Sequence, residues 1–211
     1  MQTRLIIFCT VFTIIALLEV LRPHRKRKLN RWQRWPSNIG ISSLSSVLTY
    51  YILPITAIGA AQLAQENQWG LLNQLSSSLW INILVTVLVF DLIIYWQHRI
   101  FHSVPILWRL HKMHHQDLDL DVTTGARFHP IEIMLSALIK ISFVFILGPA
   151  PLAILVFEIL LNATAMFNHS NLLIPDKLNR FLVKFLVTPE MHKVHHSTKW
   201  QEFNTNFGFN L

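Results

Sequence analysis

Five long apolar stretches divide the chain, and each has about the length that a membrane-spanning helix requires. At a rise of 1.5 Å per residue, a helix needs about 20 apolar residues to cross the hydrocarbon core, with a range of about 17–25. The second stretch contains Pro54, which neighbouring helices in a membrane can accommodate. The last two stretches meet at Gly148-Pro149-Ala150-Pro151 and are predicted to form a tight helical hairpin. The pattern predicts spans over residues 5–21, 41–61, 79–97, 131–148 and 151–167.

The amino-acid composition agrees with a membrane protein and disfavours a soluble enzyme. Of the 211 residues, 52% are hydrophobic and 14% are charged, whereas a soluble globular protein carries roughly 25% charged residues. The same composition excludes a disordered chain. The single cysteine, Cys9, excludes a disulfide framework and a cluster of thiolate zinc ligands.

The positions of the basic residues predict which ends of the spans face the cytoplasm. The chain carries 18 Lys and Arg residues, with a dense run over residues 22–34, directly after the first span. More follow the third and fifth spans, whereas the loop 62–78 carries none. Because cytoplasmic loops are enriched in Lys and Arg, the basic loops are expected inside and the bare loop outside. The basic run is therefore expected to contact anionic lipid headgroups, and nucleic acid is not an expected partner.

Residues 175–187 are predicted to form one more helix, lying in the cytoplasmic interface. Leu178, Phe181 and Phe185 fall on one face of this helix, and lysine and arginine side chains fall on the other. An amphipathic helix with a basic polar face lies along a membrane surface, and proline suits its first turn.

Histidine is the most informative residue type, with 11 in the chain. Residues four apart share a helix face, so His98 and His102 are expected to point the same way at the end of the third span. The motifs HKMHH and HKVHH each place three imidazoles on one face, at spacings of three and four. The clustered histidines, all on the predicted cytoplasmic side, are His98, His102, His111, His114, His115, His169, His192, His195 and His196.

This arrangement of imidazoles favours a dinuclear metal site. Neutral imidazole suits iron, zinc, copper or nickel, and nine ligands are too many for one ion. Shared between two ions, they provide four or five each and leave an open position for a small molecule, whereas a structural zinc site is closed by four ligands. His129, before Pro130, is interpreted as a helix cap or an outer hydrogen-bond partner, with a ligand role left open. His24, in the basic run, is expected to face lipid headgroups.

Carboxylates that hydrogen-bond to ligand histidines fix the ring orientation in such sites. Asp91 and Asp121 are the predicted catalytic side chains. Asp91 ranks first because an ionisable residue inside a span is functional by default, although a hydrogen bond to a neighbouring helix is the alternative. The other candidates are Asp117, Asp119, Glu132 and Glu190, and the three aspartates at 117–121 also fit a solvated loop.

The order of these motifs resembles the fatty acid hydroxylase/sterol desaturase superfamily. HRIFH, HKMHH, FNHSN and HKVHH carry the likeness, which runs from about residue 19 to the end and is similar to the bacterial sterol desaturase branch. It implies an integral-membrane oxygenase in which the nine histidines bind two non-haem iron ions. Such enzymes use O2 and external electrons to hydroxylate or desaturate a lipid. The family usually continues with Trp-Asp and Phe-Gly-Thr, so truncation at the C-terminus is expected.

The expected fold is an all-α integral-membrane bundle of four to five segments with a cytoplasmic histidine-rich helical cap, in a bacterial inner membrane. Residues 1–211 are expected to form one domain, with an anchor span and basic loop at 1–35 and a catalytic region at 79–211. The sequence has no nicotinamide or phosphate-loop motif. Electrons are therefore expected from a separate carrier, either a cytochrome b5-like protein or a ferredoxin.

The predicted function is an O2-dependent di-iron oxygenase acting on a membrane lipid such as a sterol or a fatty acyl chain, and two other functions fit parts of the pattern. A zinc-dependent hydrolase of lipid headgroups would use paired ions to generate hydroxide, but the histidine clusters contain no bridging carboxylate. A metal transporter would need polar ligands near the bilayer midplane. The ionisable residues within the spans are Glu19, Asp91, Lys140 and Glu158, with no histidine among them.

Overall fold

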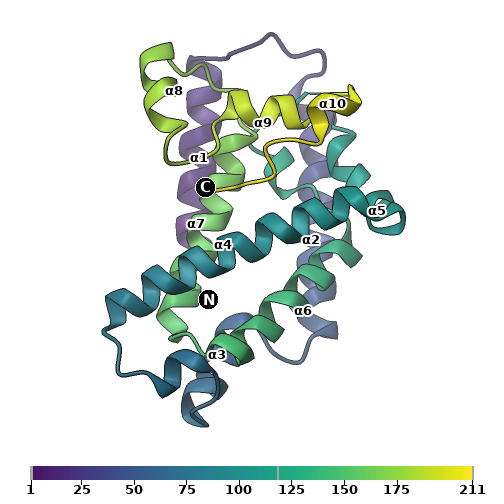
Figure 1. Ribbon diagram of the computed structural model, residues 1–211. Helices are drawn as coiled ribbons and strands as arrows, with labels where there is room; N and C mark the ends of the chain where they lie inside the picture. The colour runs from purple at the N-terminus through teal and green to yellow at the C-terminus, as the bar shows by residue number, and fades with distance from the viewer. Residues whose placement is uncertain (1, 118, 211) are drawn as a thin grey trace.

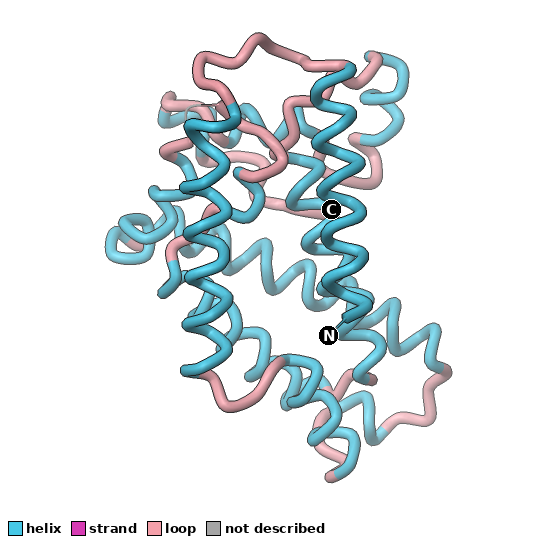
Figure 2. The backbone as a smooth tube through the Cα atoms, turned by 180° about the vertical axis from the view of Figure 1, so that it is seen from behind, coloured by secondary structure: helices cyan, strands magenta, loops and turns pink. Residues whose placement is uncertain are grey.

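The computed structural model describes residues 2–117 and 119–210, which are mostly helical (Figure 1; Figure 2). Outside helices and turns, these residues contain an isolated β-bridge between Pro23 and Leu172. Five helical segments are long and apolar enough to cross a membrane, as predicted. The helices are α1 (Gln2–Leu21), α2 (Arg31–Ile52), α3 (Ala57–Glu66), η1 (Leu71–Gln74), α4 (Leu79–Ser103), α5 (Pro105–His115), η2 (Thr124–Ala126), α6 (Pro130–Leu147), α7 (Pro151–Asn168), α8 (Asp176–Leu182), α9 (Pro189–His195) and α10 (Trp200–Phe203).

The second predicted span is wrong in its boundaries. α2 begins earlier, at Arg31, and ends at Ile52, and the chain is extended at Leu53 (φ −91°, ψ 123°). Pro54 is the cause, because the residue before a proline is disfavoured in helical geometry and proline has no N–H to donate. The side chain of Thr56 then caps the first turn of α3. Two helices therefore replace the single span.

α7 is the central helix of the bundle. It packs against α4, α1 and α3, while α6 packs against α2 and α3. Where α4 crosses α7 (Figure 1), the fully buried rings of Phe90 and Phe157 lie 5.2 Å apart. Within a bilayer, such close packing holds helices together, because lipid tails are as apolar as the side chains.

The turn between α6 and α7 is tight, as predicted, but the two helices diverge from it (Figure 1). Gly148 ends α6 in the left-handed conformation (φ +65°), which glycine adopts without strain. A Cβ atom at Gly148 would stand 2.4 Å from the carbonyl oxygen of Trp69, so the segment after α3 fills the space beside the turn. The hairpin opens into a V against which α3 packs.

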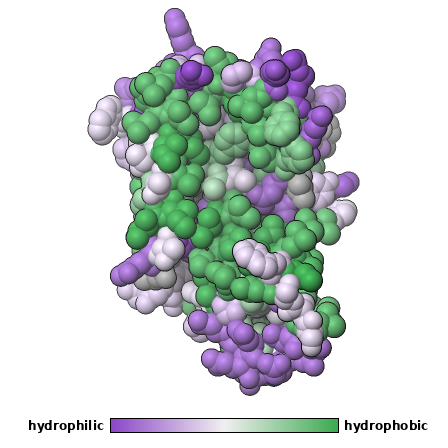
Figure 3. All heavy atoms as spheres, turned by 90° about the vertical axis from the view of Figure 1, so that its left-hand side faces the viewer, coloured by the Kyte–Doolittle hydropathy of each residue, from purple (hydrophilic) through white to green (hydrophobic). Residues whose placement is uncertain are grey.

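The surface between the two hydrophilic ends of the molecule is broadly apolar (Figure 3). On α4, Leu84, Leu88 and Leu92 are exposed by 59%, 45% and 56% and follow one another along one helix face. A contiguous apolar stripe of this kind marks a surface that lies against lipid or protein. Together with the five spans, it agrees with an integral membrane protein.

The charge buried on α7 is paired. Glu158 forms ion pairs with Arg4 of α1 and with Lys140 of α6, whose Nζ lies 3.5 Å from Oε1. Ionisable residues inside a membrane bundle are expected to pair in this way, because an unpaired charge in hydrocarbon is costly. This ion-pair network joins three of the spans.

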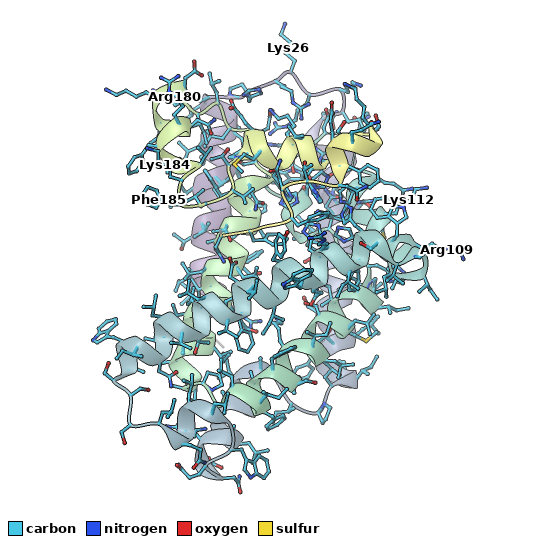
Figure 4. The ribbon with its side chains drawn as sticks, in the orientation of Figure 1. Lys26, Arg109, Lys112, Arg180, Lys184 and Phe185 are labelled. Carbon is cyan, nitrogen blue, oxygen red and sulfur yellow. The ribbon has the colours of Figure 1, made fainter. Side chains whose placement is uncertain are left out.

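The predicted interfacial helix is present but shorter than expected. α8 covers Asp176–Leu182 and is followed by turns rather than further helix. Phe181 and Phe185 are largely exposed. Figure 4 shows Arg180, Lys184 and Phe185 projecting outward from this corner of the molecule. Basic and aromatic groups therefore share one outer edge, as an interfacial segment requires.

Candidate metal centre

Four helix ends bring the clustered histidines to one end of the bundle. His98 and His102 lie on the last turns of α4, as predicted, and His169 is the C-cap residue of α7. The HKMHH motif ends α5, and the HKVHH motif covers the end of α9 and its C-cap. Pro105 and Pro189 stand in the first turns of these two short helices, a position that proline favours.

The nine histidines separate into two groups, and within each group one ring nitrogen per residue lies within 4.8 Å of the others. His114 and His115 belong to different groups, because neighbouring side chains on a helix point about 100° apart. The planes of their rings make an angle of 86°. The five-histidine group is His98, His102, His111, His115 and His195, and the four-histidine group is His114, His169, His192 and His196.

In the four-histidine group, one ring nitrogen has more close nitrogen neighbours than hydrogen bonds between the rings can explain. His169 Nε2 lies 2.9 Å from Nε2 of His114, 2.9 Å from that of His192 and 3.2 Å from that of His196. A ring nitrogen offers either a proton or a lone pair, so it satisfies only one such contact. Two nitrogens bound to one ion at about 2.0–2.1 Å are about 3.0 Å apart at right angles and about 3.4 Å apart in tetrahedral geometry. The group therefore fits a metal ion.

The five-histidine group shows the same convergence. His98 Nε2 lies 3.1 Å from Nε2 of His111 and 3.0 Å from that of His195. The ring of His102 lies 4.6 Å from that of His195, centroid to centroid, and 4.8 Å from that of His115. Nε2 of His115 is buried without a hydrogen-bond partner. Buried polar atoms without a partner point to a missing ligand, so this group also fits a metal ion.

Backbone carbonyls hold the opposite nitrogen of several rings. A carbonyl oxygen only accepts hydrogen bonds, so each of these Nδ1 atoms carries the proton and leaves the Nε2 lone pair free to bind a metal. Two of the carbonyls belong to the C-terminal tail, residues 204–210, which folds back over the site. The pairs are His98 with Phe207 at 2.9 Å, His195 with Thr205 at 2.8 Å, His114 with Arg127 at 3.2 Å and His169 with Ala165 at 2.6 Å.

Within the described residues, the carboxylate that contacts a histidine of the two groups is that of Glu132. Its Oε1 lies 2.6 Å from Nδ1 of His111, and both side chains are buried. A carboxylate in this position orients the ring and raises its basicity as a ligand. From the sequence, Glu132 ranks below Asp91 and Asp121, because no local pattern shows which acid in a distant helix faces a given ring.

Asp91 lies two helical turns before His98 on α4 and is not in either group. Its Oδ1 accepts a hydrogen bond from Asn210 Nδ2 at 2.6 Å. This contact fastens the C-terminal tail to α4, close to the tail carbonyl of Phe207 that holds His98. Asp91 thus makes a structural hydrogen bond, as the alternative prediction had it, although its partner lies in the C-terminal tail and not in a neighbouring helix.

Asp121 belongs to a buried network that joins α2 to the chain after α5. Its Oδ2 accepts from Arg34 Nη1 at 2.8 Å and from Trp35 Nε1 at 3.1 Å. Arg34 also pairs with Asp117 at 2.6 Å. Burial alone would raise the pKa of Asp117, but hydrogen bonds from Arg34 and Thr124 outweigh it and hold that pKa below 3.8. Asp119 is also buried, and its Oδ2 accepts the backbone N–H groups of Lys28 and Leu29, each at 2.8 Å. The interpretation of these aspartates as a solvated loop is therefore wrong.

Glu19 is a fully buried connector that the sequence analysis counted only as an ionisable residue in a span. Its Oε1 accepts the N–H groups of Val122 and Asn171, each at 2.8 Å. Its Oε2 accepts from Arg27 at 2.7 Å and from Arg31 at 3.1 Å. The available signal was an acid at the end of an apolar span followed directly by an arginine-rich run.

The two remaining histidines lie outside both groups. His129 is the N-cap residue of α6, and its Nδ1 accepts the N–H of Ile131 at 3.2 Å, which agrees with the interpretation as a helix cap. His24 is half-buried, and its backbone N–H donates to the backbone carbonyl of Asn171 at 3.0 Å. The basic loop thus folds onto the segment after His169, and the expectation that the His24 side chain faces lipid headgroups stays a prediction.

The surroundings of the grouped rings that lie outside the spans lower their pKa values and so favour the neutral form. Burial lowers the pKa of His111, His114 and His192 well below 6.5, and repulsion between neighbouring charged rings lowers it further. The same causes act on His195, while burial lowers the pKa of His169 to about 4. Neutral imidazole is the form that binds a metal ion.

Candidate membrane spans that end in two buried groups of converging imidazoles define a membrane protein with a histidine-rich candidate metal centre. The chain belongs to the fatty acid hydroxylase family, since the model of that family, described as "Fatty acid hydroxylase", matches residues 83–211. The matched region contains all nine clustered histidines. The resemblance drawn from the histidine motifs is confirmed.

The chain is also similar to individual lipid-modifying proteins. It is 25% identical to an ornithine lipid hydroxylase of Rhizobium tropici over 98% of its length, and 29% identical to an alkylglycerol monooxygenase of Xenopus tropicalis over 85%. It is 31% identical to a cholesterol 25-hydroxylase of Rattus norvegicus over 62%. The chain spans 63%, 40% and 43% of these relatives. All three names describe oxidoreductases. No solved structure matches the chain.

Proposed function

We propose that this chain is an oxidoreductase that uses O2 and two iron ions to hydroxylate a C–H bond of a membrane lipid. One observation carries the proposal: two groups of histidines, with converging Nε2 atoms, lie at the ends of membrane spans. A lipid in the bilayer can reach such a site without crossing water. The names of the relatives favour insertion of oxygen over desaturation.

The ligand set favours iron over hydrolytic zinc. Among the residues that the structure describes, both groups consist of histidines, without a carboxylate that could bridge two ions. Hydrolytic two-metal sites generate hydroxide, usually between bridged ions. When bound, iron at the two groups supplies the activation of O2 that an unreactive C–H bond requires. The nine histidines are the proposed ligands.

The chain's own residues keep the rings oriented. The carbonyls of Thr205 and Phe207 and the carboxylate of Glu132 hold protons on Nδ1 atoms, so that Nε2 lone pairs face inward. Asp91 and Asp121 act as positioning residues in this proposal. Asp91 holds the tail through Asn210, and Asp121 holds the loop after α5.

The histidine end is proposed to face the cytoplasm of a bacterium, where an electron carrier can reach it. The basic loop 22–34 lies at the same end of the molecule as α9, and cytoplasmic loops are enriched in basic residues (Figure 1). Arg109 and Lys112 project outward from α5, next to the ligand His111 (Figure 4). An acidic ferredoxin or cytochrome b5-like protein is the proposed donor.

Lipid analysis with labelled oxygen tests this function. The chain is produced in a bacterial host with a matching electron donor, and the lipids are compared by mass spectrometry with those of cells that produce His114→Ala. We expect a lipid one oxygen atom heavier that takes its label from O2 and is missing with His114→Ala. His129→Asn, which retains a helix cap, is the matched control and should retain the product. Oxygen derived from water, or an equal product with His114→Ala, would contradict the proposal.

A further inference from the structure

A cleft of about 680 Å³ opens beside the five-histidine group. One wall is the end of α4, with Tyr95, Arg99 and His102, and the other is the C-terminal tail over residues 204–208 together with Met191 of α9. His102 is one of the proposed ligands, so the cleft leads directly to the centre. A pocket of several hundred Å³ is large enough to enclose a small molecule or the polar part of a lipid.

The rim of the cleft lies against apolar surfaces on two sides. On α4, the exposed stripe of Leu88 and Leu92 continues to Trp96, which is 49% exposed and lies one turn before Arg99. On the other side, Val187 lines the cleft just after the exposed Phe185 that follows α8. A ligand that enters between these surfaces comes from the bilayer rather than from bulk water.

Arg99 supplies the charge at the mouth. Its guanidinium lies over the ring of Trp96, 5.3 Å from the centroid, and this cation–π contact orients the side chain. Within the part of the chain that the structure describes, no carboxylate lies within ion-pairing distance of Arg99. The remaining polar lining is uncharged, from residues such as Ser103, Asn204 and Asn206. The cleft is therefore complementary to one anionic group.

We propose that this cleft binds the anionic headgroup of a membrane lipid, with Arg99 pairing with its phosphate or carboxylate. Guanidinium and an oxyanion of this kind form two parallel hydrogen bonds. Arg99 and His102 are three residues apart on one helix, so their Cβ atoms are about 5–6 Å apart. The carbon that faces the five-histidine group then lies a few bonds from the headgroup and not near the end of a long acyl chain. This position of attack rests on the proposed oxygenase function, whereas headgroup binding does not.

Binding is measured on the full-length protein without metal, in uncharged detergent, by native mass spectrometry. The probes are dipalmitoyl phosphatidic acid and dipalmitoylglycerol, which share acyl chains and differ in the phosphate. We expect the phosphatidic acid to bind more tightly, and Arg99→Gln to weaken its binding at least tenfold, equivalent to about 1.4 kcal/mol. Arg109→Gln, which removes an exposed arginine outside the cleft, is the matched control and should bind as the wild type does.

Three results would overturn the headgroup site: equal binding of both lipids, unchanged binding by Arg99→Gln, or equal losses in both arginine variants. Glycerol 3-phosphate separates a lipid site from a free-anion site. If it displaces the phosphatidic acid at equal concentration, the cleft is an anion site and the lipid proposal fails. Headgroup binding without any O2-dependent product would leave this site standing and refute the oxygenase function, so the two failures are distinguishable.

Discussion

The carboxylate of Glu132 and the imidazole of His111 lie 2.6 Å apart, both buried, although they come from two different helices. The carboxylate contacts Nδ1 of His111. The other ring nitrogen, Nε2, therefore faces Nε2 of His98, 3.1 Å away. The orientation of a ring in α5 is thus set by the first turn of α6, which His129 caps.

We expect Glu132→Gln to weaken metal binding at the five-histidine group about 10- to 100-fold, the range found when an outer carboxylate partner of a ligand histidine is lost. The amide keeps the size of the side chain but removes the charge that makes the ring a stronger ligand. Iron affinity is measured by competition with a chelator. Glu66→Gln, an exposed change far from the site, is the control. Wild-type affinity in Glu132→Gln would show that the contact has only a packing role.

The unequal size of the two groups predicts unequal responses to ligand loss. His114→Ala leaves three histidines in its group, whereas His102→Ala leaves four in the other. We therefore expect His114→Ala to lose about one ion per chain and His102→Ala to retain both with weaker binding of one. Metal content per chain, measured on purified protein, distinguishes the two variants. Equal metal loss in both would contradict the division into groups of five and four.

Replacing Glu19, which lies outside the metal centre, is expected to lower the stability of the protein strongly. Glu19→Gln removes the charge that accepts from Arg27 and Arg31, and hydrogen bonds to a charged group contribute about 1.5–3 kcal/mol each. We expect a clear drop in the apparent melting temperature in detergent, together with loosening of the segment around Asn171, measured by hydrogen exchange. Glu66→Gln again serves as the surface control. A melting temperature equal to that of the control would show that the network adds no net stability.

Gly125 links a short turn to the four-histidine group. A Cβ atom there would lie 2.6 Å from the carbonyl oxygen of Ala165, which accepts from His169. Gly125→Ala should therefore displace His169 and lower iron content, although Gly125 touches no proposed ligand. Gly40→Ala is the matched control, because nothing lies within 4 Å of its Cβ and alanine favours a helix by up to about 1 kcal/mol. Equal iron content in the two variants would contradict this coupling.

Much of the site could be predicted from local spacing. Histidines at i and i+4 share a helix face, and each motif keeps that pair in one group: His111 with His115, and His192 with His196. The histidine at i+3 joins the other group, so the expectation that all three rings share one face is wrong, although the motifs were sufficient to predict that the histidines cluster. The spans followed from apolar length alone. The break at Leu53 was predictable in principle from Pro54, since membrane context relaxes the effect of proline but does not remove it.

The remaining features depend on tertiary contacts that no local pattern encodes. Glu132 faces His111 because α6 packs beside α5, and Arg34 buries Asp121 because α2 lies against the following loop. The carbonyls of Thr205 and Phe207 act through the backbone, which every residue shares. The assignment of adjacent His114 and His115 to different groups likewise depends on where α7 and α9 end.

The central claim is that each histidine group holds one iron ion, and metal analysis of the anaerobically purified protein tests it most directly. After reconstitution with ferrous iron and removal of loosely bound metal, the account predicts two iron ions per chain and about one in His114→Ala. No retained iron in the wild-type protein, or two ions in His114→Ala, would contradict it.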